Sequence, residues 1–274
     1  MISVAKAHAY GNDFLFVPAE QAEGVRVDEL TRRLCDRHAG LGADGVIYYA
    51  TAPDGTARMR LINADGSPSE LSGNGLRCLA ALVLHQRAGT GERPLTEVRV
   101  DTDAGWKMLS LVSQQGSRYT FSAAMGQPER VAQESIEAAG ETLTVTTLAV
   151  GNPQCVALVS ELPDHPRFNR LGPALATHAR FAEGTNVEFA VIESPDRLRI
   201  LIWERGVGPT LASGTGACAA AIAAISHGGA GRDLQVIAPG GTQRVEWRDD
   251  GIYLTGWAEV LFEGRWVPVP ADFS

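Results

Sequence analysis

The chain has 274 residues, of which 45% are hydrophobic and 20% are charged, and its formal net charge is −8. This composition is typical of a globular protein that is long enough for one large or two smaller hydrophobic cores. The negative charge, together with the lack of any basic run, argues against a nucleic-acid-binding protein.

The N-terminal sequence "MISVAKAHAYGNDFLF" lacks the charged, apolar and small-residue regions of a signal peptide. No segment reaches the roughly 18 apolar residues that span a bilayer, so we expect no membrane partner and a cytoplasmic location. The four cysteines lie far apart, without the spacing of a zinc site or a disulfide framework. We therefore expect free buried thiols and no bound metal.

In the first half of the chain, period-two runs rich in β-branched and aromatic residues predict strands. These runs lie at 2–6, 14–17, 45–50, 57–62, 97–101, 108–112 and 118–122. Helices are predicted over 27–38 and in the segment after Gly75. The phrase "GLGADG" (40–45) matches a dinucleotide-binding pattern, but it follows a helix and precedes a strand. This is the reverse of the order that a dinucleotide site requires, so we reject it as a cofactor site.

The second half contains period-two runs of the same kind, and its helices are predicted near 165–179 and after Gly216. Its predicted strands lie at 142–150, 154–160, 186–192, 197–203, 234–238, 243–247 and 251–257. The polar stretch 122–135 has no strong periodicity and is the best candidate boundary. We place the junction near residue 118, with lobes at 1–118 and 119–263, and treat 264–274 as a candidate return to the first lobe.

Two Ser-Gly-X-Gly phrases, "SGNG" (72–75) and "SGTG" (213–216), each run into a helix that is apolar nearly all round. Such a helix must be surrounded by protein. The sequence therefore predicts an α/β (α+β) fold with two pseudo-symmetric lobes, each a β-barrel-like curved sheet around a central buried helix. The repeated phrase makes an internal duplication plausible.

A glycine-rich turn that opens a helix leaves unpaired N–H groups at the positive end of the helix dipole, which together form an anion site. Two such ends could bind one carboxylate. The alternative interpretation is that Ser72 and Ser213 are simply N-caps, a role that serine fills well. The sequence pattern alone leaves both interpretations open.

Eight ordered motifs cover nearly the whole chain and resemble the diaminopimelate epimerase family. They are "HAYGNDF" (8–14), "GLGADG" (40–45), "MRLINADGS" (59–67), "SGNGLRC" (72–78), "GNPQCV" (151–156), "TNVEF" (185–189), "ERGVGPTLASGTGAC" (204–218) and "PGG" (239–241). The resemblance implies two α/β lobes with the active site in the cleft between them, and a homodimer. It also implies epimerisation of LL- to meso-diaminopimelate, a precursor of lysine and peptidoglycan, without cofactor or metal.

The family uses two cysteines on opposite faces of the α-carbon, and the positions that match them are Ser72 and Ser213. Gln154 stands where the family has a histidine that helps to set thiol protonation, and Glu204 matches an acid that assists one cysteine. The resemblance further implies backbone and side-chain contacts to an amino-acid substrate. These contacts would come from Asn12, Asn63, Gly73, Asn74, Asn152, Asn186, Glu204, Arg205, Gly214 and Thr215.

A serine hydroxyl needs an adjacent general base, whereas a thiol is easily tuned to a thiolate near neutral pH. Glu204 and Asp65 are candidates for that base. Three function hypotheses therefore stay open: a serine-based epimerase or racemase; an isomerase or dehydratase on another amino or hydroxy acid; and an amino-acid-binding homologue without turnover. A hydrolase that uses Ser213 is a distant fourth. Because Gln154 departs from the family along with both serines, natural divergence is favoured over engineered replacement.

Overall fold

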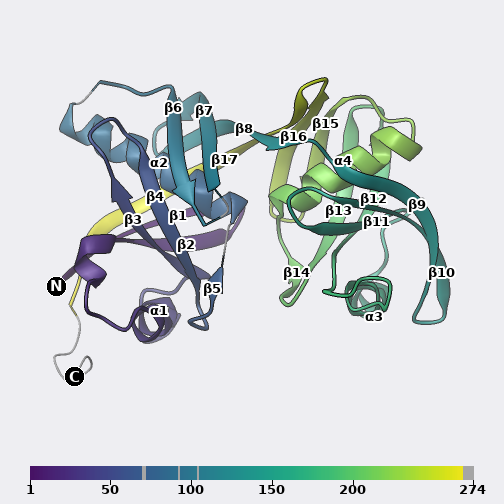
Figure 1. The fold of residues 1–274 in the computed structure, drawn as a ribbon, viewed down its shortest axis with the longest axis horizontal. Helices are drawn as coiled ribbons and strands as arrows, with labels where there is room; N and C mark the ends of the chain where they lie inside the picture. Colours follow the sequence, from purple (N-terminus) through teal and green to yellow (C-terminus); the bar gives the residue numbers. More distant parts are fainter. Residues whose placement is uncertain (70–71, 92, 104, 268–274) are drawn as a thin grey trace. The chain divides into compact units, whose positions relative to one another are not determined.

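The computed structural model describes residues 1–69, 72–91, 93–103 and 105–267 (Figure 1). The chain divides into two compact units. The first contains Met1–Ala123 and the chain from Gly256 onward, and the second contains Ala124–Thr255. The sequence suggested a junction near residue 118 and a return to the first lobe at 264. In the structure, the chain passes from the first unit to the second within the strand β8 (Arg118–Gly126) and returns to the first unit within β17 (Gly251–Trp266).

In the first unit, strands surround the helix α2 (Gly73–Thr90), and a second helix, α1 (Val27–Cys35), lies outside them (Figure 1). The strand pairing runs β17, β1, β2, β3, β4, β6, β7, β8. The pairs β2–β3 and β4–β6 are parallel, and the others in this run are antiparallel. The remaining elements are β1 (Ile2–Ala9), β2 (Asn12–Pro18), η1 (Ala19–Ala22), β3 (Gly45–Thr51), β4 (Ala57–Asn63), β5 (Pro68–Ser69), β6 (Glu97–Thr102) and β7 (Gly105–Gln115).

The second unit repeats this connectivity around the helix α4 (Gly214–His227), with α3 (His165–Ala176) in the place of α1. Its pairing runs β9, β10, β11, β12, β13, β15, β16, β17, and β11–β12 and β13–β15 are the parallel pairs. The strands are β9 (Glu129–Ala138), β10 (Glu141–Ala149), β11 (Pro153–Leu158), β12 (Asn186–Ser194), β13 (Arg197–Glu204), β14 (Gly208–Thr210), β15 (Asp233–Ala238) and β16 (Gly241–Arg248).

The two central helices are buried because their sequences carry no polar face. Every residue of α2 from Asn74 to Leu84 is buried, and in α4 the buried run is 216–224. The small alanines of α4 let the strands approach closely, and the surrounding cluster includes Val156, Ala190 and Ile202. Burial of each large aliphatic side chain contributes about 1.5–3 kcal/mol relative to exposure. The predicted fold class, a curved sheet around one buried helix in each half, is confirmed.

Two details of the predicted elements differ in the structure. The candidate boundary at 122–135 includes the division between Ala123 and Ala124, but it is not irregular, since β8 continues to Gly126 and the unpredicted strand β9 begins at Glu129. The helices that were expected after Gly75 and Gly216 begin earlier, at Gly73 and Gly214, so the glycine phrases form their first turns. "GLGADG" joins α1 to β3, the order on which its rejection rested.

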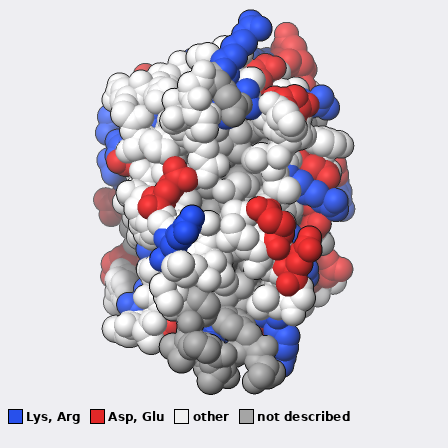
Figure 2. Space-filling model, turned by 90° about the vertical axis from the view of Figure 1, so that its left-hand side faces the viewer, with Lys and Arg blue, Asp and Glu red and all other residues white. Residues whose placement is uncertain are grey.

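Acidic and basic side chains are interspersed over the face drawn in Figure 2. A net charge of −8 is therefore not gathered into one patch on that face. Among the helices in the described part of the chain, none combines the length and apolar character that crossing a membrane requires.

Candidate functional site

The N-terminus of α2 is capped by Ser72, which has an extended backbone (φ −124°, ψ 121°). Its Oγ accepts a hydrogen bond of 3.1 Å from the backbone N–H of Gly75. The first two amides of the helix, those of Gly73 and Asn74, have no partner within the helix and lie at the positive end of its dipole. A Cβ on Gly75 would lie 2.9 Å from the Cδ1 of Ile47, so the turn packs directly on strand β3.

Polar side chains around this turn form a chain of hydrogen bonds. Asn74 donates from Nδ2 to the Oδ1 of Asn12 at 3.2 Å, and Asn12 donates to Asp44 at 2.6 Å. Arg77, which is only 2% exposed, donates to the Oδ1 of Asn74 at 2.5 Å. We call Ser72 to Gly75, with Asn12 and Arg77, the α2 site.

The predicted substrate residue Asn63 ends β4, and the candidate base Asp65 lies in the turn that follows. Asn63 donates to the Oγ of Ser67 at 3.1 Å. The carboxylate of Asp65 accepts from both the backbone N–H and the hydroxyl of Ser67, and these bonds lower its pKa. Asp65 therefore organises its own turn, and among the described residues no titratable side chain is hydrogen-bonded to Ser72.

The N-terminus of α4 is built in the same way. Ser213 is only 7% exposed, and its Oγ accepts a hydrogen bond of 3.2 Å from the N–H of Gly216. The Oγ of Ser213 also lies 3.5 Å from the Oγ1 of Thr215. Burial raises the pKa of Glu204, and the neighbouring Ser213 hydroxyl opposes that shift without cancelling it. Ser213 thus lies beside a carboxylate, and among the described residues Ser72 has no such neighbour joined to it.

Four further predicted residues lie in or beside β11, β12 and β13: Asn152 precedes β11, Gln154 lies in it, Asn186 begins β12 and Arg205 follows β13. The side chain of Asn186 accepts from the backbone N–H of Arg205 at 2.9 Å. Gln154 is buried, and its Nε2 donates to the Oδ1 of Asn152 at 2.6 Å. The guanidinium of Arg205 donates to the carbonyl of Glu183 at 3.0 Å.

Arg205 also lines a cavity of about 380 Å³ that is bounded by Pro173, Thr177 and Trp203. The guanidinium is therefore exposed to a space that could take a polar group. Together, Ser213 to Gly216, Glu204, Asn186 and Gln154 form what we call the α4 site. Gly184, which lines the same cavity as Arg205, has a φ of +73° and packs against the Arg205 side chain.

One residue of the α4 site was not predicted from the sequence. Glu188, within the "TNVEF" motif, is completely buried, and neither carboxyl oxygen has a hydrogen-bond partner among the described residues. Its Oε1 lies 2.6 Å from the position that a Cβ on Gly216 would take. Burial, and secondarily the charge of Glu204, raise the pKa of Glu188 well above its ordinary value. An acid within the otherwise apolar run 187–192 was the available signal.

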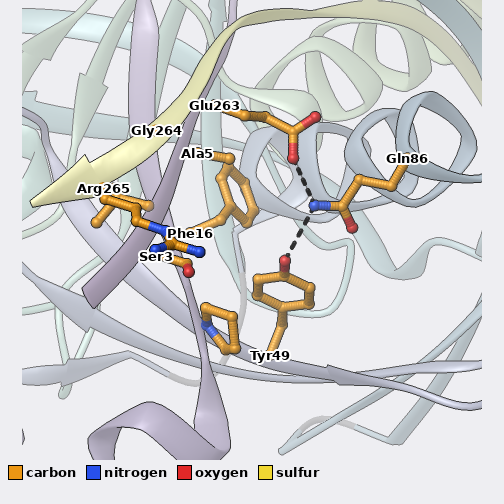
Figure 3. A pocket seen from close by; sticks show the side chains of 10 residues that line it. Ser3, Ala5, Phe16, Tyr49, Gln86, Glu263, Gly264 and Arg265 are labelled. Atoms are coloured by element: carbon orange, nitrogen blue, oxygen red, sulfur yellow. Dashed lines mark hydrogen bonds between the residues drawn. The ribbon is translucent and has the colours of Figure 1, made fainter. Parts of the chain in front are cut away.

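A separate cavity in the first unit, of about 320 Å³, lies away from the predicted residues (Figure 3). In it the Nε2 of Gln86 donates to the hydroxyl of Tyr49 at 3.3 Å and to Glu263 at 2.7 Å. Gln86 is 14 residues beyond Ser72, which along a helix corresponds to roughly 20 Å. None of the predicted site residues lines this cavity.

The described residues contain no cluster of three or more His, Cys, Asp or Glu side chains that could hold a metal ion. The four cysteines are buried and free. Burial raises the pKa of the Cys35 thiol to about 12, and it raises the pKa values of Cys78 and Cys155 further. These thiols stay protonated at neutral pH and do not replace the two serines as reactive groups.

The comparisons with known proteins identify the family. The family model of "Diaminopimelate epimerase" matches residues 4–131 and 146–261. The diaminopimelate epimerase of Desulfitobacterium hafniense is 38% identical over 281 residues, covering 96% of this chain and 97% of the relative. That of Synechocystis sp. is 37% identical over 283 residues, covering 96% and 98%.

Solved structures support the fold at lower identity. A probable proline racemase from Agrobacterium radiobacter, with bound carbonate, superposes with a TM-score of 0.68 at 16% identity, covering 99% of this chain and 94% of the other. A hydroxyproline epimerase from Agrobacterium vitis, with bound trans-4-hydroxy-L-proline, gives 0.67 at 16% identity, covering 96% and 90%. On the full-length matches to its curated relatives, the chain belongs to the diaminopimelate epimerase family, a family of isomerases.

Proposed function

We propose that this protein epimerises LL- to meso-diaminopimelate without a cofactor, with Ser72 and Ser213 in place of the family's two cysteines. The observation that carries the proposal is the placement of the Ser213 hydroxyl beside Glu204, a partly buried carboxylate whose pKa is raised by burial. A serine becomes basic only beside a general base, and a base works best when its pKa approaches the operating pH. Glu204 lies beside Ser213, and its pKa is shifted in that direction.

In the proposed first step, the Oγ of Ser213 takes the α-proton while its own proton passes to the carboxylate of Glu204. Negative charge then develops on the α-carbon and spreads into the substrate carboxylate. The unpaired amides of Gly214 and Thr215 lie at the positive end of α4 and would stabilise that charge. Ser72 would return a proton to the α-carbon, and the amides of Gly73 and Asn74 would support it in the same way.

The remaining predicted residues complete the proposal. Asn12, Asn63, Asn152, Asn186 and Arg205 would contact the ammonium and carboxylate groups of the substrate. Gln154 can hydrogen-bond but cannot titrate, so it would orient rather than carry protons. We also propose a homodimer that acts in the cytoplasm, and sedimentation analysis at several concentrations checks the dimer.

A second candidate function rests on a different observation. Ser72 is hydrogen-bonded to Gly75, and no base is joined to it among the described residues. If only Ser213 has a base and Ser72 is only a cap, the protein could exchange the α-proton of an amino acid without inverting the α-carbon. It could also bind the amino acid without any exchange. The amino-acid-binding homologue without turnover is therefore the alternative that the experiment must separate.

The test follows the α-carbon of LL-diaminopimelate in deuterated buffer by NMR, with chiral separation of the products. Deuterium at the α-carbon together with meso product, at rates well above buffer, supports the epimerase. Exchange without inversion assigns only the Ser213 side to the reaction. Saturable binding without exchange contradicts the epimerase and supports the binding homologue. A panel of other amino and hydroxy acids in the same assay tests the diverged isomerase or dehydratase.

The matched controls are Ser213→Ala and Glu193→Gln. Ser213→Ala removes the group that takes the proton and should abolish exchange. Glu193 lies on the same strand as Asn186, at the other end of β12, where it is exposed and paired with Arg197 and Arg199. Its replacement should leave exchange unchanged, so equal loss in both variants would point to general damage to the fold.

A further inference from the structure

Glu188 is buried beneath the first turn of α4, where no described residue offers its carboxyl group a hydrogen bond. Its strand β12 lies between β11 and β13, and Glu188 pairs with Val156 on one side and Ile202 on the other. Directly opposed residues share a face, and both neighbours belong to the core around α4. The side chain therefore points at α4.

The carboxyl group and the cap share the space around one glycine. A Cβ on Gly216 would lie 2.6 Å from the Oε1 of Glu188 and 3.2 Å from the Cβ of Ser213. The nearby helix amides are already occupied, because Gly216 donates to the Oγ of Ser213 and Ala217 donates to its carbonyl at 3.1 Å. An ionised carboxylate at this place would have neither solvent nor donors among the described residues.

The charged and titratable groups around Glu188 offer no compensation either. From β13 it faces Glu204, a like charge, whereas the neighbouring thiol of Cys155 on β11 is paired with Val187 and points to the other face of the sheet. The first turn of α4 carries no charged side chain, since it consists of Gly214, Thr215, Gly216 and Ala217. An unpaired charge in such a place is so unfavourable that the group binds a proton instead.

We propose that Glu188 is a positioning residue that keeps its proton beneath the first turn of α4, so that this turn stays free for a carboxylate ligand. Glu204 is then the only charged acid of the α4 site. This inference rests on the proposed function only for the identity of the ligand. Because an anion at the turn and a charge on Glu188 repel each other, ligand binding and the protonation of Glu188 are reciprocally linked.

The first test is independent of any substrate. The protein is labelled with ¹³C at the glutamate carboxyl carbons, and the resonance missing in Glu188→Gln identifies Glu188. We expect that resonance at the position of a protonated carboxyl group at pH 7, and we expect its titration to move to lower pH in Glu204→Gln. Glu193→Gln, which deletes a paired and ionised acid, should remove a different resonance. A Glu188 resonance that titrates near pH 4.3, the ordinary glutamate value, would overturn the proposal.

The second test adds the ligand. Diaminopimelate should raise the pH at which the Glu188 resonance titrates, or leave the group protonated to the highest pH reached. A ligand that lowers this midpoint would contradict the proposed linkage. If the protein neither binds nor exchanges diaminopimelate, the proposed substrate fails, yet the protonation state measured without ligand still decides the case for Glu188.

Stability supplies a readout if Glu188→Gln folds poorly. Glu188→Ile should fold, since Ile47 occupies the corresponding place beneath Gly75. Above pH 4.3 the unfolded chain loses the Glu188 proton while the folded protein keeps it, so wild type loses stability as pH rises. Above pH 5, and until Glu188 ionises in the folded protein, the unfolding constant of wild type should rise relative to Glu188→Ile by up to about tenfold per pH unit. A ratio that does not change with pH would overturn the proposal.

Discussion

The N-termini of α2 and α4 are built on the same backbone plan but carry different chemistry. Ile47 pairs with Leu61 in the first unit as Glu188 pairs with Ile202 in the second. Each lies beneath the third residue of its helix, a glycine that admits no Cβ without displacement. The plan accounts for the repeated Ser-Gly-X-Gly phrase, since both phrases cap a helix and bring its first turn onto a parallel pair of strands.

The difference between the two ends lies in the residues that face each cap. The positions two residues beyond Leu61 and Ile202 are Asn63 and Glu204, so an amide stands where the other unit has an acid. Beneath the glycine, an isoleucine corresponds to Glu188. The α2 site thus supplies amides and one buried arginine, whereas the α4 site supplies two acids of raised pKa. The two turns share one backbone plan and differ in the side chains around them.

The largest effect should come from replacing both serines by cysteine. Thiols have pKa values of about 8.5 and ionise far more readily than hydroxyl groups, so Ser72→Cys with Ser213→Cys should raise epimerisation by about 10²- to 10⁴-fold. Chiral analysis of the diaminopimelate product measures it. The single variants sharpen the comparison, because Ser72→Cys should help more, as Ser213 already has Glu204. A folded double variant that stays inert would show that the two sites differ from active relatives in more than the nucleophiles.

Removal of the base should give the next largest effect. Glu204→Gln keeps the shape of the side chain but cannot accept a proton, so α-proton exchange should fall by about 10²-fold or more. In wild type the exchange rate should rise with pH through a midpoint above the ordinary glutamate value of about 4.3, because the base must be ionised and its pKa is raised. A pH profile shared by wild type and Glu204→Gln would assign the base to another group.

The two glycines beneath the caps allow a comparison in stability. An alanine Cβ would lie 2.9 Å from the terminal methyl of Ile47 at Gly75, and 2.6 Å from the carboxyl oxygen of Glu188 at Gly216. Overpacking of this kind costs about 1–3 kcal/mol, and we expect Gly216→Ala to be the more destabilised variant. Chemical unfolding monitored in each unit measures the difference. Equal losses of stability in the two variants would show that the carboxyl group of Glu188 moves aside as easily as the methyl group of Ile47.

The sequence predicted the helices, most strands and the serine-glycine turns because these segments have strong local signals. It missed β9 because eight of its ten residues are not buried, and only Ile136 and Ala138 reach the core. Without a buried alternating face, such a strand is indistinguishable from a polar linker. The role of Glu188 was missed for the opposite reason. Its strand is buried on both faces over 186–190, so alternation gave no indication of which side chain meets α4.

The smallest expected effect separates the two roles of the serines. Ser72→Ala removes a helix cap and should cost about 1 kcal/mol of stability, with the first turn of α2 loosened. Ser213→Ala removes an equivalent cap and also the hydroxyl that lies beside Glu204. Donation from that hydroxyl to the ionised carboxylate would contribute about 1.5–3 kcal/mol, so the second variant should lose more stability above the pKa of Glu204, where that acid is ionised. Below that pKa the two losses should converge, since the bond no longer involves a charge. If the losses stay equal at every pH, Ser213 is a cap like Ser72 and the α4 site has no special proton donor.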